Sequence, residues 1–162
     1  YISQLLSATY KNAPRCRSGN DIIDAIVNCK AAEAEEKEIA FTFSVHLTSA
    51  IYIPPIDLCA VLSNQLDNAL EASQKISEKQ ERYVKVVIEQ KGNFLSFHVE
   101  NRVNDNPFDS KGILATTKTD HPSLHGLGIQ NIMETVEKHL GTLENTYRDY
   151  VFISFAVMQN TV

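Results

Sequence analysis

The order of helix-like and strand-like segments constrains the fold of this chain more than any other feature of the sequence. In one segment the apolar residues Ile39, Phe41, Phe43 and Val45 alternate with polar or small residues, which is typical of a strand with one buried face. The expected helices are 21–37, 56–76 and 129–140, and the remaining expected strands are 83–89, 94–100, 142–147 and 150–158. This order predicts an α+β fold, a two-layer α/β sandwich in which helices cover one face of a mixed, mostly antiparallel sheet.

One domain accounts for most of the chain. Its 162 residues, of which 43% are hydrophobic, are enough to bury a single core. Pro14 and Gly19 interrupt the pattern before Asn20, a residue type that caps helices well. We therefore expect residues 1–19 to be the end of an upstream helix and a connector, and residues 20–162 to form the domain. The first residue is not methionine, so we expect a fragment of a longer protein.

Composition argues against several classes of protein. The net charge of -5 and the pI of about 5.5 do not fit a nucleic-acid-binding surface. No stretch approaches the length of a membrane span, so we expect this fragment to be soluble and to make no membrane contact. The three cysteines form no C-x-x-C pair, and an odd count in a domain of ordinary size suits a reducing, cytoplasmic compartment.

The helix expected at 56–76 has two different faces. At about 100° per residue, Asn64, Asn68, Glu71 and Lys75 share a narrow arc. The opposite arc is apolar and consists of Leu58, Val61, Leu62, Leu66 and Ala69. The amide oxygens of Asn64 and Asn68 suit a magnesium ion that is held mainly by nucleotide phosphates, and Asn68 is the better ligand candidate. The alternative is an asparagine pair that is merely solvated, although asparagine is a mediocre helix former.

Gly126-Leu127-Gly128 opens the helix expected at 129–140. Backbone N–H groups and the positive dipole end of a helix attract phosphate, and glycine lets the main chain approach it closely. A tight turn is the alternative interpretation. No lysine-serine or lysine-threonine follows to make a P-loop, and no full dinucleotide fingerprint is present.

The segment 116–125 is rich in hydroxyl groups and turn formers, and we expect it to be a lid that closes over a nucleotide. Lys118 could reach a phosphate as a point charge, and a solvated loop lysine is the alternative. His121 and His125 have no cysteine or carboxylate partner at metal-ligand spacing, so we do not expect a zinc site. We expect His125 to order the end of the lid.

Together these motifs resemble the catalytic, ATP-binding domain of a bacterial sensor histidine kinase. Three runs occur in the order found in that family: Asn64-Gln-Leu-Asp-Asn68-Ala-Leu-Glu71-Ala72, Thr116-Thr-Lys118 and His125-Gly126-Leu-Gly128-Ile129. The resemblance extends from about Asn20 to Val157 and is closest to the peptide-pheromone-sensing group. It implies the Bergerat fold of the wider ATPase superfamily.

The resemblance also implies a site for ATP and Mg²⁺. It suggests catalytic roles for Asn64, Asn68 and Lys118, with Mg²⁺ on Asn68. The implied nucleotide-binding residues are Asn64, Asn68, Glu71, Asn101, Thr117, Lys118, His125, Gly126, Leu127 and Gly128. The sequence departs from the superfamily at Asn101, which stands where an aspartate usually meets the adenine amino group, and two nearby glycines are missing. An amide oxygen can still accept that hydrogen bond, without the assistance of a charge.

The implied function is to donate the γ-phosphoryl group of ATP to a histidine on an upstream helical segment that this chain lacks. The implied partners are the protein's own dimerisation and phosphoacceptor helices and a response regulator, in a full-length protein anchored to the membrane. Asn64 stands where hydrolytic relatives carry a glutamate base, so we expect slow ATP hydrolysis. One alternative is a nucleotide-gated regulatory domain without catalysis, and another is ordinary helix and turn chemistry.

Overall fold

The computed structural model describes residues 15–112, 114 and 127–161. The elements follow the expected order of helices and strands. They are α2 (Asp21–Glu36), β1 (Ala40–His46), α3 (Pro55–Gln74), the short 3-10 helix η1 (Lys79–Glu81), β2 (Tyr83–Lys91), β3 (Phe94–Arg102), α4 (Leu127–Lys138), β4 (Thr142–Arg148) and β5 (Val151–Gln159). Most boundaries fall within one or two residues of those expected from periodicity.

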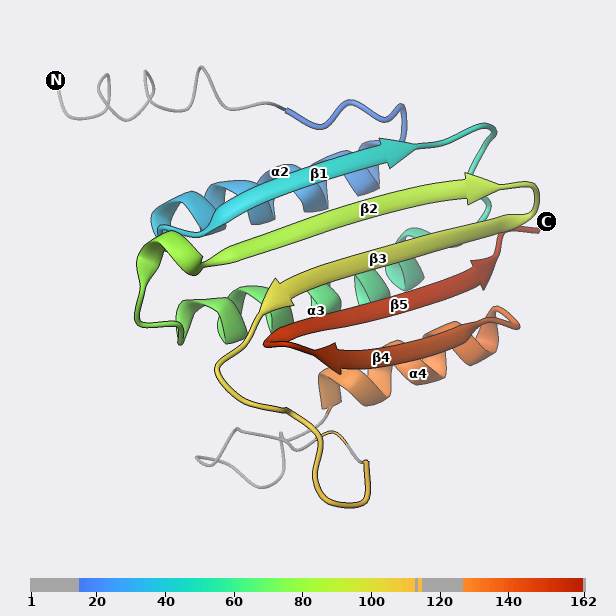
Figure 1. The fold of residues 1–162 in the computed structure, drawn as a ribbon. Helices are drawn as coiled ribbons and strands as arrows, with labels where there is room; N and C mark the ends of the chain where they lie inside the picture. The colour runs from blue at the N-terminus through green and yellow to red at the C-terminus, as the bar shows by residue number, and fades with distance from the viewer. Residues whose placement is uncertain (1–14, 113, 115–126, 162) are drawn as a thin grey trace, which may run out of the picture.

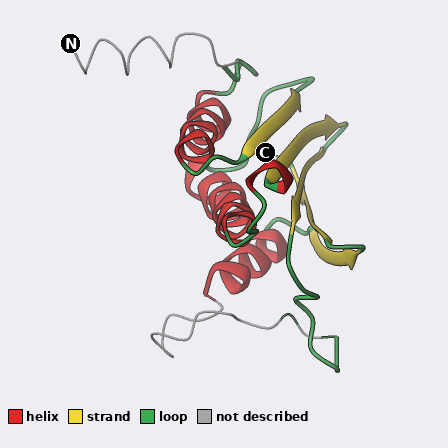
Figure 2. Ribbon diagram, turned by 60° about the vertical axis from the view of Figure 1, so that its left-hand side comes forward, coloured by secondary structure: helices red, strands yellow, loops and turns green. Residues whose placement is uncertain are grey.

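The molecule has two layers, with the helices on one face of a five-stranded sheet (Figure 1). The strand order is β1-β2-β3-β5-β4. Seen from the side, α2, α3 and α4 lie together against the same face of the sheet (Figure 2). The predicted α/β sandwich is therefore confirmed.

The sheet is mixed because one of its four strand pairings is parallel. β1 pairs with β2 in parallel, from Ala40 opposite Tyr83 to His46 opposite Glu89, and α3 makes the crossover between them. The other three pairings are antiparallel. Gly92, with φ of +57°, turns β2 into β3, a left-handed conformation that glycine adopts without steric penalty.

Local chemistry fixes where the first two long helices begin. The side-chain oxygen of Asn20 accepts hydrogen bonds from the backbone N–H groups of Ile22 (3.1 Å) and Ile23 (3.0 Å), which confirms the expected cap of α2. Pro55 occupies the first position of α3, where its missing N–H would have had no partner within the helix. α3 therefore begins one residue before the expected boundary.

The core lies between the inward faces of the strands and the apolar sides of the helices. Its largest fully buried side chains include Ile23, Leu58, Leu62, Leu66, Leu70, Ile88, Leu95, Phe97, Ile132 and Met158. Alternation along the strands sends every second residue into this core, as the sequence pattern predicts. None of the helices within the described residues is long and apolar enough to cross a membrane.

Candidate functional site

Helix α3 separates a packing face from a polar face, as its periodicity predicts. The five apolar residues of the packing face are all buried. Asn64, Asn68 and Glu71 on the other face are partly exposed, and Lys75 is exposed. Lys75 Nζ lies 3.7 Å from a carboxylate oxygen of Glu71, one turn earlier.

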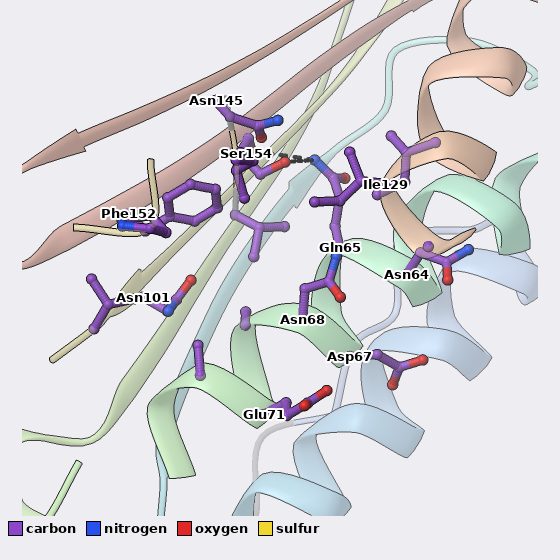
Figure 3. Close-up of a pocket in the computed structure, with 18 of the residues that line it drawn as sticks. Asn64, Gln65, Asp67, Asn68, Glu71, Asn101, Ile129, Asn145, Phe152 and Ser154 are labelled. Atoms are coloured by element: carbon purple, nitrogen blue, oxygen red, sulfur yellow. Dashed lines mark hydrogen bonds between the residues drawn. The ribbon is translucent and has the colours of Figure 1, made fainter. Parts of the chain in front are cut away.

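The polar face of α3 borders a cavity of about 450 Å³. The cavity lies between α3, the inner face of β3, β4 and β5, the start of α4 and the loop that follows β3. Figure 3 shows Asn64, Asn68 and Glu71 on the side of α3, with Phe152, Ser154 and Asn145 facing them from the sheet. The space is large enough for a small organic molecule.

At one end of this cavity the second glycine of the predicted phosphate turn meets the asparagine face. A Cβ atom placed on Gly128 would lie 3.3 Å from Asn64 Oδ1 and 3.8 Å from Asn68 Oδ1. Residues that are 60 or more positions apart in sequence therefore converge. Gly128 is the second residue of α4, so backbone near the N-terminus of a helix lies beside two amide oxygens.

The side chain of Asn64 is held in one orientation. Its Nδ2 group donates to the backbone carbonyl of Ala60, one turn earlier, over 2.6 Å. A carbonyl can only accept, so the amide cannot be reversed and Oδ1 stays beside Gly128. Among the described residues, the side chain of Asn68 has no hydrogen-bond partner and keeps its oxygen available. Two hard, neutral oxygen donors next to a helix N-terminus are ligands that suit Mg²⁺ on a phosphate.

The charges around this end of the cavity are balanced. Lys30 of α2 lies 2.5 Å from Asp67 and 2.7 Å from Glu33, so a lysine neutralises the carboxylate next to Asn68. Burial alone would lower the pKa of Lys30, but the hydrogen bonds and charges of Asp67 and Glu33 outweigh it and raise the pKa. Lys30 therefore stays protonated, and the negative potential that would repel phosphate is reduced.

The start of α4 is held in place through the opposite end of that helix. Asp57, which is buried in the first turn of α3, accepts hydrogen bonds from Lys138 Nζ (2.8 Å) and pairs with His139 Nε2 (2.7 Å). Burial would raise the pKa of the Asp57 carboxyl, but these two groups hold it below its ordinary value. The contact fixes α4 against α3 and so helps to position Gly128.

At the other end of the cavity Asn101 ends the inward-facing row of β3. It is only 2% exposed, and its Nδ2 group donates to the backbone carbonyl of Arg102 over 3.0 Å. The same argument as for Asn64 fixes this amide, so its oxygen remains available as an acceptor at the cavity wall. Asn101 therefore offers one acceptor to the cavity, and its contact with adenine stays a prediction.

The walls between these two ends are largely apolar. They include Ala69 and Ala72 of α3, Val99 of β3, Ile132 of α4, and Leu143 and Phe152 of the last two strands. Such walls suit a flat aromatic ring, which packs its faces on apolar side chains and needs hydrogen bonds only at its edge.

Two polar residues on the cavity floor were not among the predicted site residues. Gln65 is 2% exposed, and its Nε2 group donates to both the backbone carbonyl (3.2 Å) and the hydroxyl oxygen (3.0 Å) of Ser154. Gln65 Oε1 is buried without a hydrogen-bond partner in the described part of the chain. A buried acceptor in that state costs about 1–3 kcal/mol.

The sequence did contain a signal for these two residues. Gln65 falls among the apolar positions Leu62, Leu66 and Ala69 of α3, and Ser154 falls among the inward-facing positions of β5. A polar residue at a core position is either a fault or a functional feature. Their proximity could not be seen, because it depends on how β5 lies against α3.

Several predicted site residues lie outside the described residues. These are Thr117, Lys118, His125 and Gly126, together with the whole predicted lid at 116–125. Leu127 begins α4, but its side chain is not described. The roles of these five residues stay predictions. The other predicted site residues line the same cavity: Asn64, Asn68, Glu71, Asn101 and Gly128.

Comparison with protein families agrees with this geometry. A family model for the GHKL domain matches residues 53–159, which span α3 to β5 and contain every described residue of the cavity. No curated protein matches the sequence significantly.

Solved structures of histidine kinases share the fold. The nucleotide-free catalytic domain of the histidine kinase ThkA superposes with a TM-score of 0.68 at 18% identity, covering 92% of this chain and 97% of that one. The Acinetobacter baumannii histidine kinase AdeS superposes with a TM-score of 0.62 at 11% identity, covering 99% of this chain and 76% of that one. The mycobacterial sensor histidine kinase MprB superposes with a TM-score of 0.60 at 18% identity, covering 85% of this chain and 93% of that one. At these identities the similarity is evidence for the fold alone.

Proposed function

This chain belongs to the GHKL domain family, and on that premise we propose that it is the ATP- and magnesium-binding catalytic domain of a sensor histidine kinase. The observation that carries the proposal is the convergence of Gly128 with the amide oxygens of Asn64 and Asn68 at one end of the cavity. The fold shared with histidine kinase catalytic domains supports it.

The two ends of the cavity suit the two ends of ATP. The triphosphate would lie beside the first turn of α4, where backbone N–H groups near Gly128 can donate to it. The base would lie between the apolar walls near Asn101, whose oxygen accepts from its amino group. Asn68, assisted by Asn64, would hold Mg²⁺, which when bound neutralises phosphate charge.

The residues of this site position a phosphoryl group better than they activate water. Asn64 is an amide held by Ala60 and cannot accept a proton, so the described site has no general base at that place. Phosphoryl transfer needs mainly alignment and charge neutralisation. We therefore propose slow hydrolysis and transfer to a histidine that another segment of the full-length protein supplies.

The remaining partners follow from this assignment as proposals. The phosphoacceptor histidine would lie on a helical segment upstream of this chain, and the phosphohistidine would serve a response regulator. The full-length protein would be a membrane-anchored sensor with this domain in the cytoplasm. Thr117, Lys118 and His125 would act from the lid over the phosphates.

One experiment tests the assignment in two steps. Calorimetry should show that ATP binds to the chain tightly in the presence of Mg²⁺ and much more weakly with EDTA. Mixing the chain with a separate helical segment that carries the phosphoacceptor histidine, together with γ-labelled ATP, should then label that segment. The chain alone should acquire no stable label.

The outcome also separates the kinase from a second candidate, a regulatory domain that binds nucleotide without catalysis. The replacement of the usual aspartate by Asn101 favours that candidate, because it removes a charge-assisted contact. Magnesium-dependent binding without label on the histidine would support the regulator. Absence of any nucleotide binding would refute both.

A further inference from the structure

Asp67 places a carboxylate at the rim of the cavity, next to Asn68. It is one of the residues that line the cavity, its side chain is 52% exposed, and it lies on the side of α3 that points away from the sheet (Figure 3). Asn64 precedes it by about one turn of the same helix, and a Cβ atom on Gly128 would meet both Asn64 and Asn68. Asp67 therefore lies at the proposed phosphate end of the cavity, on its solvent side.

A carboxylate at this place has an electrostatic cost, because it repels a triphosphate. Lys30 offsets that cost. Its Nζ atom lies 2.5 Å from Asp67 Oδ1 and 2.7 Å from Glu33 Oε2, and its side chain is only 17% exposed. A partly buried ion pair stabilises a protein little more than an uncharged pair of similar size, so joining α2 to α3 does not require these charges. The carboxylate beside the phosphates therefore needs another explanation.

Lys30 also fixes the direction of this carboxylate. It bonds Oδ1 of Asp67, whereas Oδ2 has no hydrogen-bond partner among the described residues. Burial would lower the pKa of Lys30, but its hydrogen bonds with Asp67 and Glu33 raise that pKa above its ordinary value. The lysine stays charged at neutral pH and the contact persists. Asp67 thus presents one oriented acceptor to a group that approaches the phosphates from solvent.

We propose that Asp67 is a catalytic residue, which accepts a hydrogen bond from the imidazole N–H of the incoming phosphoacceptor histidine and so turns the other imidazole nitrogen toward the γ-phosphorus. The inference rests on the proposed function, since it names the group that receives this histidine. A carboxylate in such a place fixes the tautomer and the orientation of an imidazole. It also stabilises the positive charge that the ring gains, without taking the proton itself.

The transfer step balances without a further reactant. The unprotonated imidazole nitrogen gives its electron pair to the γ-phosphorus. The bond between this phosphorus and the oxygen that joins it to the β-phosphate breaks, and ADP leaves with the electron pair of that bond. The phosphorylated ring carries a positive charge until its N–H proton passes to water. Asp67 is a carboxylate before and after the step.

Asp67→Asn in the full-length protein tests this proposal. Asparagine keeps the shape, and its carbonyl oxygen can still accept from Lys30, but it then presents an NH₂ group where Asp67 presented an acceptor. The rate at which γ-labelled ATP labels the histidine should fall by about 100-fold or more, the range for groups that assist proton-bearing nucleophiles. Calorimetry should show that affinity for Mg-ATP is unchanged or higher, because a negative charge beside the phosphates is lost.

Two further variants make the result specific. Asp67→Glu restores a carboxylate and should label the histidine at least about tenfold faster than Asp67→Asn, which a merely structural role would not produce. Glu33→Gln is the matched control, because it removes the other acidic partner of Lys30. It should label the histidine at the wild-type rate. Asp67 is half exposed and Glu33 is partly exposed, so all three variants should fold, and thermal melting checks this.

The results separate failure of this inference from failure of the proposed function. If the wild type labels its histidine and Asp67→Asn does so at a similar rate, Asp67 only joins α3 to α2 and the inference is wrong. It is also wrong if Asp67→Asn does not fold, or if Asp67→Glu and Glu33→Gln lose as much activity as Asp67→Asn. If the wild type binds no nucleotide or labels no histidine, the proposed kinase function fails and this inference fails with it.

Discussion

The two ends of the cavity are built in different ways. The end beside Gly128 is made by one face of α3 and one turn of α4, so its groups come from short motifs with fixed spacing. The end beside Asn101 is made where β3 and β5 lie side by side, with Asn101 opposite Phe152. The first end depends on how α4 packs against α3, whereas the second depends on the register between β3 and β5.

This difference predicts which property each end controls. Substitutions beside Gly128 should change how tightly any nucleoside triphosphate binds, because they act on the phosphates and the metal ion. Substitutions beside Asn101 should change which base is preferred, because they act on the base edge. The four predictions below test this division, from the largest expected effect to the smallest.

Asn68→Ala should have the largest effect. It should lower the affinity for Mg-ATP by about 100-fold or more, because loss of even an outer-shell partner of a metal costs about 10–100-fold. Affinities for GTP and ATP should fall together, as measured by calorimetry. Asn131→Ala, which removes an exposed asparagine from α4 away from the cavity, is the control and should bind normally. If Asn68→Ala unfolds the domain instead, Asn68 is structural.

Gly128→Ala should separate binding from stability. The new Cβ would lie 3.3 Å from Asn64 Oδ1, which cannot withdraw easily because its amide is bonded to Ala60. We expect affinity for ATP to fall by about tenfold, because the methyl group occupies space beside the phosphates. Stability should change little, since the preference of a helix for alanine over glycine, up to about 1 kcal/mol, is offset by the tight contact with Asn64.

Gly141→Ala is the contrasting control for that prediction. There the added Cβ would lie 1.9 Å from the backbone oxygen of Val157, so neighbouring backbone must move. Thermal melting should show a loss of about 1–3 kcal/mol or more. A loss of stability in Gly128→Ala as large as in Gly141→Ala would show that Gly128 serves packing and not the phosphates.

Asn101→Asp should change base preference by a smaller factor. A carboxylate can accept a charge-assisted bond from the amino group, so the preference for ATP over purine riboside triphosphate should rise by about three- to tenfold. The variant also loses the hydrogen bond to the carbonyl of Arg102, so the domain should be destabilised by about 1–3 kcal/mol. Equal changes for both nucleotides would place the base away from Asn101.

The sequence predicted the end beside Gly128 better than the end beside Asn101, for a physical reason. Asn64 and Asn68 are neighbours on any helix, so their common face follows from the period of 3.6 residues. The predicted strand also put Asn101 at its end, where it was found. These features depend only on chain geometry within one element.

Gln65 and Ser154 depend on tertiary structure and were missed. In the helical pattern Gln65 is one polar residue in an apolar stripe, and nothing nearby identifies its partner 89 positions away. The order β3-β5-β4 places Ser154 beside β3, although α4 and β4 lie between these two strands in sequence. That order is set by core packing across the whole sheet, which local spacing does not encode.

Asp57→Asn should have the smallest effect on binding and tests whether the contact between α3 and α4 supports the end beside Gly128. Asparagine keeps the shape but loses the charge that meets Lys138 and His139. Stability at pH 7 should fall by about 1.5–3 kcal/mol, the range for hydrogen bonds to charged groups. Affinity for all nucleotides should fall by about threefold or less, with no change in base preference, because α4 would be held less firmly.

The pH dependence of stability gives a separate test of the Asp57 contact. The pKa of Asp57 in the folded domain lies below its ordinary value of 3.8, so the unfolded chain binds the proton more tightly. The stabilisation is therefore fully present above about pH 5 and is lost as the pH falls through the folded pKa. Urea unfolding at pH 7 and pH 3 should show a smaller loss of stability in Asp57→Asn than in the wild type. Glu137→Gln, an exposed neighbour on α4, should behave like the wild type, and equal acid sensitivity of Asp57→Asn and the wild type would show that the carboxylate is not paired in solution.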